Sequence, residues 1–228
     1  MTRETFDREL QNLQDEILVL GSLVEKVIIE SVELLKQRDL DGARRLIAQD
    51  RRVINEKYYA IETEALTIIA TQQPMASDLR TIAAVLEIAH ELERMGDYAK
   101  GIAKITLMMG KEPLLKPLID IPLMAEKARD MLHRALEAFI NRDVDLARTI
   151  PKDDDEVDAL YNQVYRELLT YMMEDAHTIN RATYLLWVAH NLERTADRVA
   201  NICERVIFTV TGELVELDVE ESGVEGIR

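Results

Sequence analysis

Two pairs of acidic residues stand at corresponding places in the two halves of this 228-residue chain. Glu93 and Asp97 form one pair, and Glu193 and Asp197 form the other. Residues four apart on a helix lie on the same face, so each pair would bring two carboxylates side by side. Oxygen-rich sites of this kind suit Mg²⁺, Mn²⁺ or Ca²⁺. We therefore predict that each pair binds a metal ion.

A histidine precedes each pair by three residues, His90 in the first half and His190 in the second. An imidazole ligand added to the carboxylates would admit iron or zinc. The alternative is that the pairs are merely solvated, since two like charges at this spacing cost only about 0.2–0.5 kcal/mol. Their recurrence in both halves, each with a histidine and an arginine in the same frame, favours metal binding.

A further acidic pair, Asp154 and Asp158, also has the four-residue spacing of one helix face. We expect it to supply oxygen ligands from a neighbouring helix to the site in the second half. The first half has Asn55 at the position of Asp158, and Arg51 falls opposite Asp154. The first-half site is therefore predicted to bind metal more weakly or differently.

Enzymatic alternatives have less support in the sequence. Glu87 and His90 form a Glu-x-x-His motif of the kind found in di-iron helical bundles, but Trp187 stands where the second copy would need its glutamate. The chain has no Gly-rich phosphate loop, Ser-His-Asp pattern or HExxH motif. We expect no catalytic activity. A metal-dependent enzyme, either di-iron or phosphoesterase-like, and a metal-free structural adaptor remain as alternatives.

We predict that helices position these residues. Apolar residues recur in steps of three and four over residues 6–34. Asp39 is expected to cap a second helix that ends near residue 71. Ser77 or a neighbour is expected to cap a third helix, which runs to about residue 109. Gly110, Pro113, Pro117 and Pro122 then mark a linker. Further helices are expected from residue 121, over 143–173 with an interruption at Pro151, and over 179–210.

The second set of helices repeats the first. Residues 38–44 read RDLDGAR and residues 142–148 read RDVDLAR, and segments 89–103 and 189–203 are identical at seven of fifteen positions. Such matches indicate an internal duplication. We predict an all-α protein of six long helices, arranged as two tandem three-helix bundles over residues 1–114 and 115–212. An acidic, flexible tail is expected over residues 213–228.

The composition of the chain limits the cellular compartments and the classes of partner that we expect. The formal net charge of −15 argues against binding to nucleic acid or to anionic lipid headgroups. Cys203 is the single cysteine, so no intrachain disulfide is possible. Neither a secretory signal nor an apolar run of membrane-spanning length is apparent. We therefore expect a cytoplasmic protein without direct membrane insertion.

Four segments, taken in order along the duplicated frame, resemble the PhoU family of bacterial phosphate-transport accessory proteins. They are PMASDLR at 74–80, ELERMGD at 91–97, YMMED at 171–175 and LERTAD at 192–197. The resemblance extends from about residue 5 to residue 212. It implies two three-helix bundles, a cytoplasmic location, homodimers and no catalysis.

The same resemblance implies a function and a set of site residues. Such proteins restrain phosphate uptake and the phosphate-starvation response, as adaptors between the ATPase subunit of the phosphate ABC transporter and a sensor histidine kinase. Their repeated acidic motifs, which bind iron or zinc clusters, correspond here to Glu93 with Asp97 and Glu193 with Asp197. Asp154 and Asp158 correspond to a supporting pair. This chain departs from the family pattern at Thr195-Ala196 and at Arg51.

Overall fold

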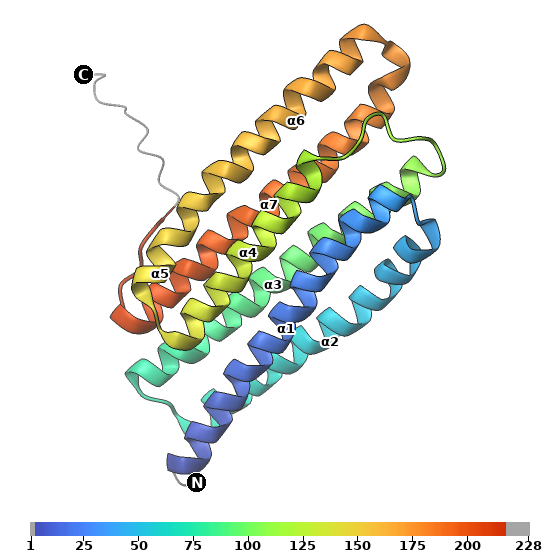
Figure 1. Ribbon diagram of the computed structural model, residues 1–228. Helices are drawn as coiled ribbons and strands as arrows, with labels where there is room; N and C mark the ends of the chain where they lie inside the picture. Colours follow the sequence, from blue (N-terminus) through green and yellow to red (C-terminus); the bar gives the residue numbers. More distant parts are fainter. Residues whose placement is uncertain (1–2, 218–228) are drawn as a thin grey trace, which may run out of the picture.

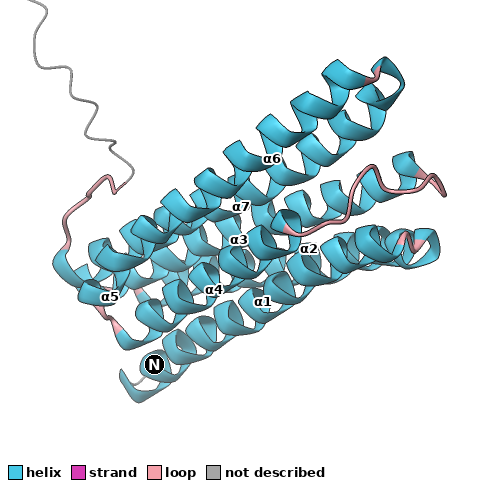
Figure 2. Ribbon diagram, turned by 45° about the horizontal axis from the view of Figure 1, so that its top comes forward, coloured by secondary structure: helices cyan, strands magenta, loops and turns pink. Residues whose placement is uncertain are grey.

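The computed structural model describes residues 3–217, and of residues 49–51 it describes the backbone alone (Figure 1). Every regular element in this described part is a helix (Figure 2). In chain order they are α1 (Arg3–Gln37), α2 (Leu40–Gln72), α3 (Ala76–Met109), α4 (Asp120–Asn141), α5 (Val144–Thr149), η1 (Ile150–Asp153), α6 (Asp154–Glu174), η2 (Ala176–Thr178) and α7 (Ile179–Thr211). The predicted all-α fold of two three-helix bundles is confirmed, with α1–α3 in one bundle and α4, α6 and α7 in the other.

Corresponding aspartates begin the second helix of each bundle. The side chain of Asp39 accepts a hydrogen bond from the backbone N–H of Gly42 at 2.9 Å. Asp143 accepts one from the N–H of Leu146 at the same distance. Each carboxylate therefore satisfies an amide that the first turn of a helix leaves without a partner. The predicted cap at Asp39 is confirmed.

The start of α3 differs from the expectation. The N-cap is Met75, which makes no side-chain hydrogen bond, and Ser77 lies inside the first turn. The carbonyl of Met75 instead accepts from the N–H of Asp78 at 2.8 Å. A backbone bond thus closes this turn in place of the serine hydroxyl.

Pro151 interrupts the predicted fifth helix, as expected. Proline lacks an N–H and its ring crowds the preceding turn of a helix. The chain here passes from α5 through the short 3-10 helix η1 before α6 begins at Asp154. Asp154 and Asp158 consequently occupy the first two turns of α6.

The two bundles share one apolar core. The third helices of the repeats, α3 and α7, pack along each other, and α1 packs against α4 (Figure 1). Fully buried side chains from both repeats, including Leu92 and Leu192, belong to a single cluster. At the α1–α4 contact, a Cβ on Gly21 would lie 2.2 Å from Leu136 Cδ1, so this glycine allows the helices to approach closely.

The connections between and after the bundles also contact the core. Residues 110–119 join the bundles and contain the predicted boundary between residues 114 and 115. Lys116 in this connection is buried and pairs with Glu167 of α6. After α7, the N–H of Leu217 donates to Glu204 Oε1 at 3.0 Å. The remainder of the predicted tail, residues 218–228, lies outside the described residues.

A buried polar contact joins α3 to α7. The carboxylate of Glu91 accepts from Arg198 Nη1 at 3.3 Å and from Asn201 Nδ2 at 3.2 Å. The duplication places Asn191 at the position of Glu91 and Gly101 at the position of Asn201. A Cβ on Gly101 would lie 3.3 Å from Asn191 Nδ2, so the symmetry-related contact is close packing of an amide on a glycine.

Replacing Glu91 with alanine removes the acceptor that serves Arg198 and Asn201. We expect the free energy of unfolding to fall by about 1–3 kcal/mol, because buried donors are then left unsatisfied. Urea unfolding at neutral pH measures the change. Glu87→Ala, one turn earlier on the exposed face of the same helix, is the control and should stay close to the wild type. Equal midpoints for the two variants would show that the contact contributes nothing.

Candidate metal-binding sites

In each repeat the acidic pair lies on the third helix, and its glutamate is close to a tyrosine of the second long helix. Glu93 is half-buried and Asp97 exposed on α3, next to the fully buried Leu92. Glu193 and Asp197 are both half-buried on α7. The four carboxylates thus lie beside the buried face of their helices.

A tyrosine and a histidine flank the glutamate in each repeat. The ring centroids of Tyr58 and His90 are 6.4 Å apart, and those of Tyr161 and His190 are 6.3 Å apart. Each tyrosine comes from the second long helix of its bundle. Sequence reasoning missed both as site residues, although they occupy matching positions in the repeat.

The tyrosines face negative charge. Burial raises the pKa of Tyr58, and the charges of Glu62 and Glu93 raise it further. Burial and the charge of Glu193 raise the pKa of Tyr161. Both phenols therefore stay protonated at neutral pH and are available as hydrogen-bond donors beside the glutamates.

The ionised form of each glutamate is disfavoured in the folded chain. Burial raises the pKa of Glu93, and the neighbouring charge of Asp97 adds to the effect. Burial likewise raises the pKa of Glu193, followed by the charge of Asp197 and a smaller contribution from Asp158. A bound cation would lower the pKa of each glutamate again, because it offsets the repulsion between the two carboxylates and replaces the solvation lost on burial.

Cations on the same helix already serve the aspartates. Lys100 Nζ lies 2.6 Å from Asp97 Oδ1, whereas Arg194 Nη1 lies 2.5 Å from Asp197 Oδ2. Glu193 Oε2 lies 3.2 Å from His190 Nδ1. Arg194 thus pairs with the aspartate one turn later and not with the adjacent Glu193. A metal ion would compete with these partners.

Three of the predicted ligands come together in the second repeat. Asp154, Asp158 and Asp197 line one hollow of about 730 Å³ between the start of α6 and α7. Glu193 lies close enough for the charge of Asp158 to affect it. In the first repeat Asn55 occupies the position of Asp158, and the side chain of Arg51 lies outside the described residues.

The carboxylates do not converge into a finished coordination shell. Within residues 3–217, no group of three His, Cys, Asp or Glu side chains is arranged closely enough to hold a metal ion. The chemistry of the donors nevertheless fits a hard cation, because half-buried carboxylates with raised pKa values gain from neutralisation. Side-chain rotation that frees Asp197 from Arg194 would be required.

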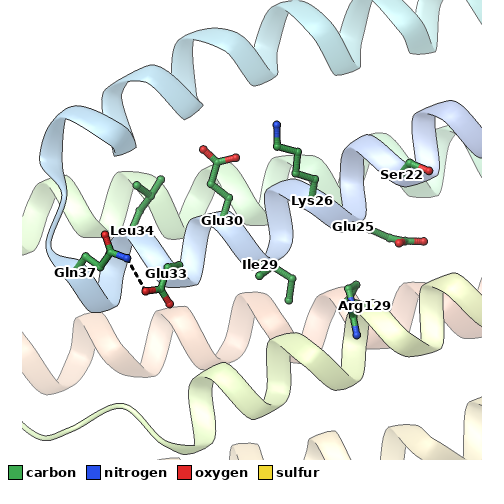
Figure 3. A pocket seen from close by; sticks show the side chains of 9 residues that line it. All are labelled: Ser22, Glu25, Lys26, Ile29, Glu30, Glu33, Leu34, Gln37 and Arg129. Atoms are coloured by element: carbon green, nitrogen blue, oxygen red, sulfur yellow. Dashed lines mark hydrogen bonds between the residues drawn. The ribbon is translucent and has the colours of Figure 1, made fainter.

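A second surface hollow, of about 640 Å³, lies over α1 (Figure 3). Glu25, Ile29 and Glu33 are on the side of α1 that faces α4 and Arg129, while Lys26 and Glu30 point toward α2. The hollow therefore spans both flanks of one helix. Its three glutamates make this strip of α1 acidic, far in sequence from the predicted ligands.

Fold and site together define a class: an all-helical protein of two duplicated bundles that presents half-buried acidic pairs beside its central helices. Comparison with known families identifies it. The PhoU domain matches the chain twice, over residues 17–106 and 121–206, and the chain belongs to the PhoU family.

Relatives match over nearly the whole chain. This chain is 37% identical to a phosphate-specific transport system accessory protein PhoU homolog of Clostridium acetobutylicum, over 96% of this chain and 100% of that protein. The accessory protein PhoU of Escherichia coli K12 is 35% identical, over 91% and 86% respectively. The crystal structure of the phosphate transport system regulatory protein PhoU from Streptococcus pneumoniae is similar with a TM-score of 0.85 and 34% identity, covering 93% of this chain and 100% of that one.

None of the described helices is both long enough and apolar enough to span a bilayer. Cys203 is buried in α7, among the side chains of the core.

The raised pKa of Glu193 has a consequence for stability. Its proton is held more firmly in the folded chain, so the free energy of unfolding falls as pH rises from the ordinary value of 4.5 through the raised pKa. In metal-free buffer, Glu193→Gln should be more stable than the wild type at pH 7 by about 0.2–0.5 kcal/mol. The gain should shrink below pH 4.5, where both states are protonated. Urea unfolding across this range measures it, with Glu87→Gln as the exposed control. A loss of stability at pH 7 would contradict the assignment.

Proposed function

We propose that this protein is a regulatory accessory protein of phosphate transport. It restrains phosphate uptake and the phosphate-starvation response, acting as an adaptor between the ATPase subunit of the phosphate ABC transporter and a sensor histidine kinase. The observation that carries the proposal is full-length similarity, in sequence and in fold, to proteins named as phosphate-transport accessory or regulatory proteins. The proposed setting is the cytoplasm, where such an ATPase subunit would be reached.

The shared core supports an adaptor role. Because both bundles bury side chains in one cluster, the helices form a rigid frame with outward faces that stay fixed relative to one another. Tyr165, Leu169 and Met173 leave an apolar stripe exposed along α6. We propose that the protein forms homodimers, and that exposed stripes of this kind serve association or docking. No catalytic step is proposed.

We further propose that the acidic pairs bind metal ions and that the metal stabilises the docking surface. Glu93 and Asp97 would hold metal in the first repeat, and Glu193 and Asp197, supported by Asp154 and Asp158, in the second. Iron or zinc suits the sites if the histidines join the carboxylates, and Mg²⁺, Mn²⁺ or Ca²⁺ suits them otherwise. The metal-free adaptor is the competing proposal, supported by the same-helix ion pairs at Asp97 and Asp197.

Elemental analysis of purified protein distinguishes the two. Glu193→Gln with Asp197→Asn should remove most of the bound metal, because the second repeat has the additional oxygens of α6. Glu93→Gln with Asp97→Asn should remove a smaller part. Thermal unfolding with and without added Mn²⁺ gives an independent readout, since a ligand that binds only the folded state raises its stability.

A matched control removes the same charge elsewhere. Glu30→Gln with Glu33→Gln changes two carboxylates on α1, away from the predicted ligands. It should leave metal content at the wild-type value. Equal metal content in all three variants, or none in the wild type after reconstitution, would favour the metal-free adaptor.

The regulatory role is tested in the source organism. Deleting the gene should switch on a phosphate-starvation reporter in phosphate-rich medium and raise phosphate uptake, because a restraint has been removed. Expression of the wild-type chain should restore both. Unchanged reporter activity and uptake in the deletion strain would refute the proposed function, whatever the metal content.

A further inference from the structure

The hollow beside Asp154 is lined by as many cationic as acidic side chains. Its acidic side chains are Asp154, Asp155, Asp158 and Asp197, and its cationic side chains are Arg148, Lys152, Arg194 and Arg198. The volume of about 730 Å³ is ample for a small ion and its water. The predicted metal ligands Asp154, Asp158 and Asp197 account for three of the acidic side chains. The four cationic side chains have no role in metal coordination and require another explanation.

Two of these cations have no acidic partner. Among the described residues, neither Arg148 nor Lys152 forms an ion pair or a side-chain hydrogen bond, although four carboxylates line the same hollow. Arg198 is positioned by Glu91 and Tyr98 of α3, and its Nε is buried without a hydrogen-bond partner. Positioned guanidinium and ammonium groups of this kind recognise oxyanions.

The charges favour joint binding of a cation and an anion. With four formal positive and four formal negative charges, the lining is neutral. A divalent metal alone would leave an excess of two positive charges, and a dianion alone would leave the reverse. Both together restore neutrality in a partly enclosed space, where charge is poorly screened.

A side-chain exchange provides a mechanism for the coupling. Asp197 is paired with Arg194, and a metal ion on Asp197 would displace that guanidinium. Arg194 lines the same hollow, so its released N–H groups would become available to an anion. Metal binding thus adds a third unpaired cation to Arg148 and Lys152.

From these contacts we propose that the second repeat contains a coupled site for a divalent metal and a phosphate-type oxyanion, with the metal on Asp158 and Asp197 and the oxyanion on Arg148, Lys152 and Arg198. The ligand class is inorganic phosphate or the phosphoryl end of a larger molecule. The first repeat does not carry the site, since Tyr98 stands at the position of Arg198. This inference rests on the proposed metal binding and deepens it.

Titration calorimetry of the full chain tests the coupling. Inorganic phosphate is titrated into protein freed of metal and into protein with bound Mn²⁺, with a protein-free titration to subtract metal–phosphate complexes. We expect Mn²⁺ to raise phosphate affinity by about tenfold or more, and phosphate to raise Mn²⁺ affinity by the same factor, because coupling between two ligands is reciprocal. Repeating the titration with a nucleoside diphosphate distinguishes the free anion from a phosphoryl group.

Variants separate the two halves of the site. Arg148→Gln with Lys152→Gln should abolish the phosphate response, while Mn²⁺ affinity in phosphate-free buffer should be equal to or higher than that of the wild type, because the lining then has two excess negative charges. Lys26→Gln with Arg129→Gln removes the same charge from the hollow over α1 and should change neither. Mn²⁺ binding without any effect of phosphate overturns this inference and leaves the metal proposal standing. Failure of Mn²⁺ to bind overturns both.

Discussion

Burial of the α3–α7 contact is the constraint on which the rest of the structure depends. Each bundle alone would leave part of its third helix in water, and the packing of α3 on α7 joins the two bundles into one cluster that contains Leu92 and Leu192. Glu93 and Glu193 directly follow these buried leucines. Both are half-buried, so their carboxylates are partly desolvated without being sealed from solvent.

Duplication gave the two repeats one frame, and substitutions on that frame separated their chemistry. Both retain a tyrosine, a histidine and an acidic pair in the same arrangement. Only the second repeat places an arginine, Arg198, where the first has Tyr98. That arginine contacts Glu91 of the other repeat, so the proposed oxyanion site would be partly built by the first bundle. The two bundles are therefore joined by a polar contact as well as by the shared core.

Much of the fold follows from local physics and was predictable. Helical periodicity, the cap at Asp39 and the interruption at Pro151 depend on neighbours in sequence. The position of the acidic pairs beside the core follows from the same periodicity. Contacts that depend on the register between helices were not predictable. Examples are the ring contact of Tyr58 with His90 and the hydrogen bond of Arg198 to Glu91. Predicting them requires knowing which turns of two helices meet.

The ion-pair partners of the two aspartates were not predicted from the sequence either. Asp97 and Asp197 occupy equivalent positions, yet Lys100 pairs with one and Arg194 with the other, because Ala200 stands at the position of Lys100. Exposed pairs of this kind contribute about 1 kcal/mol or less. The continuous core offsets the cost of half-buried, repelling glutamates, so the sites need not stabilise the fold. Carboxylates that are held in place, incompletely neutralised and paired only weakly are free to exchange one cation for another, which is the property a metal-dependent regulator requires.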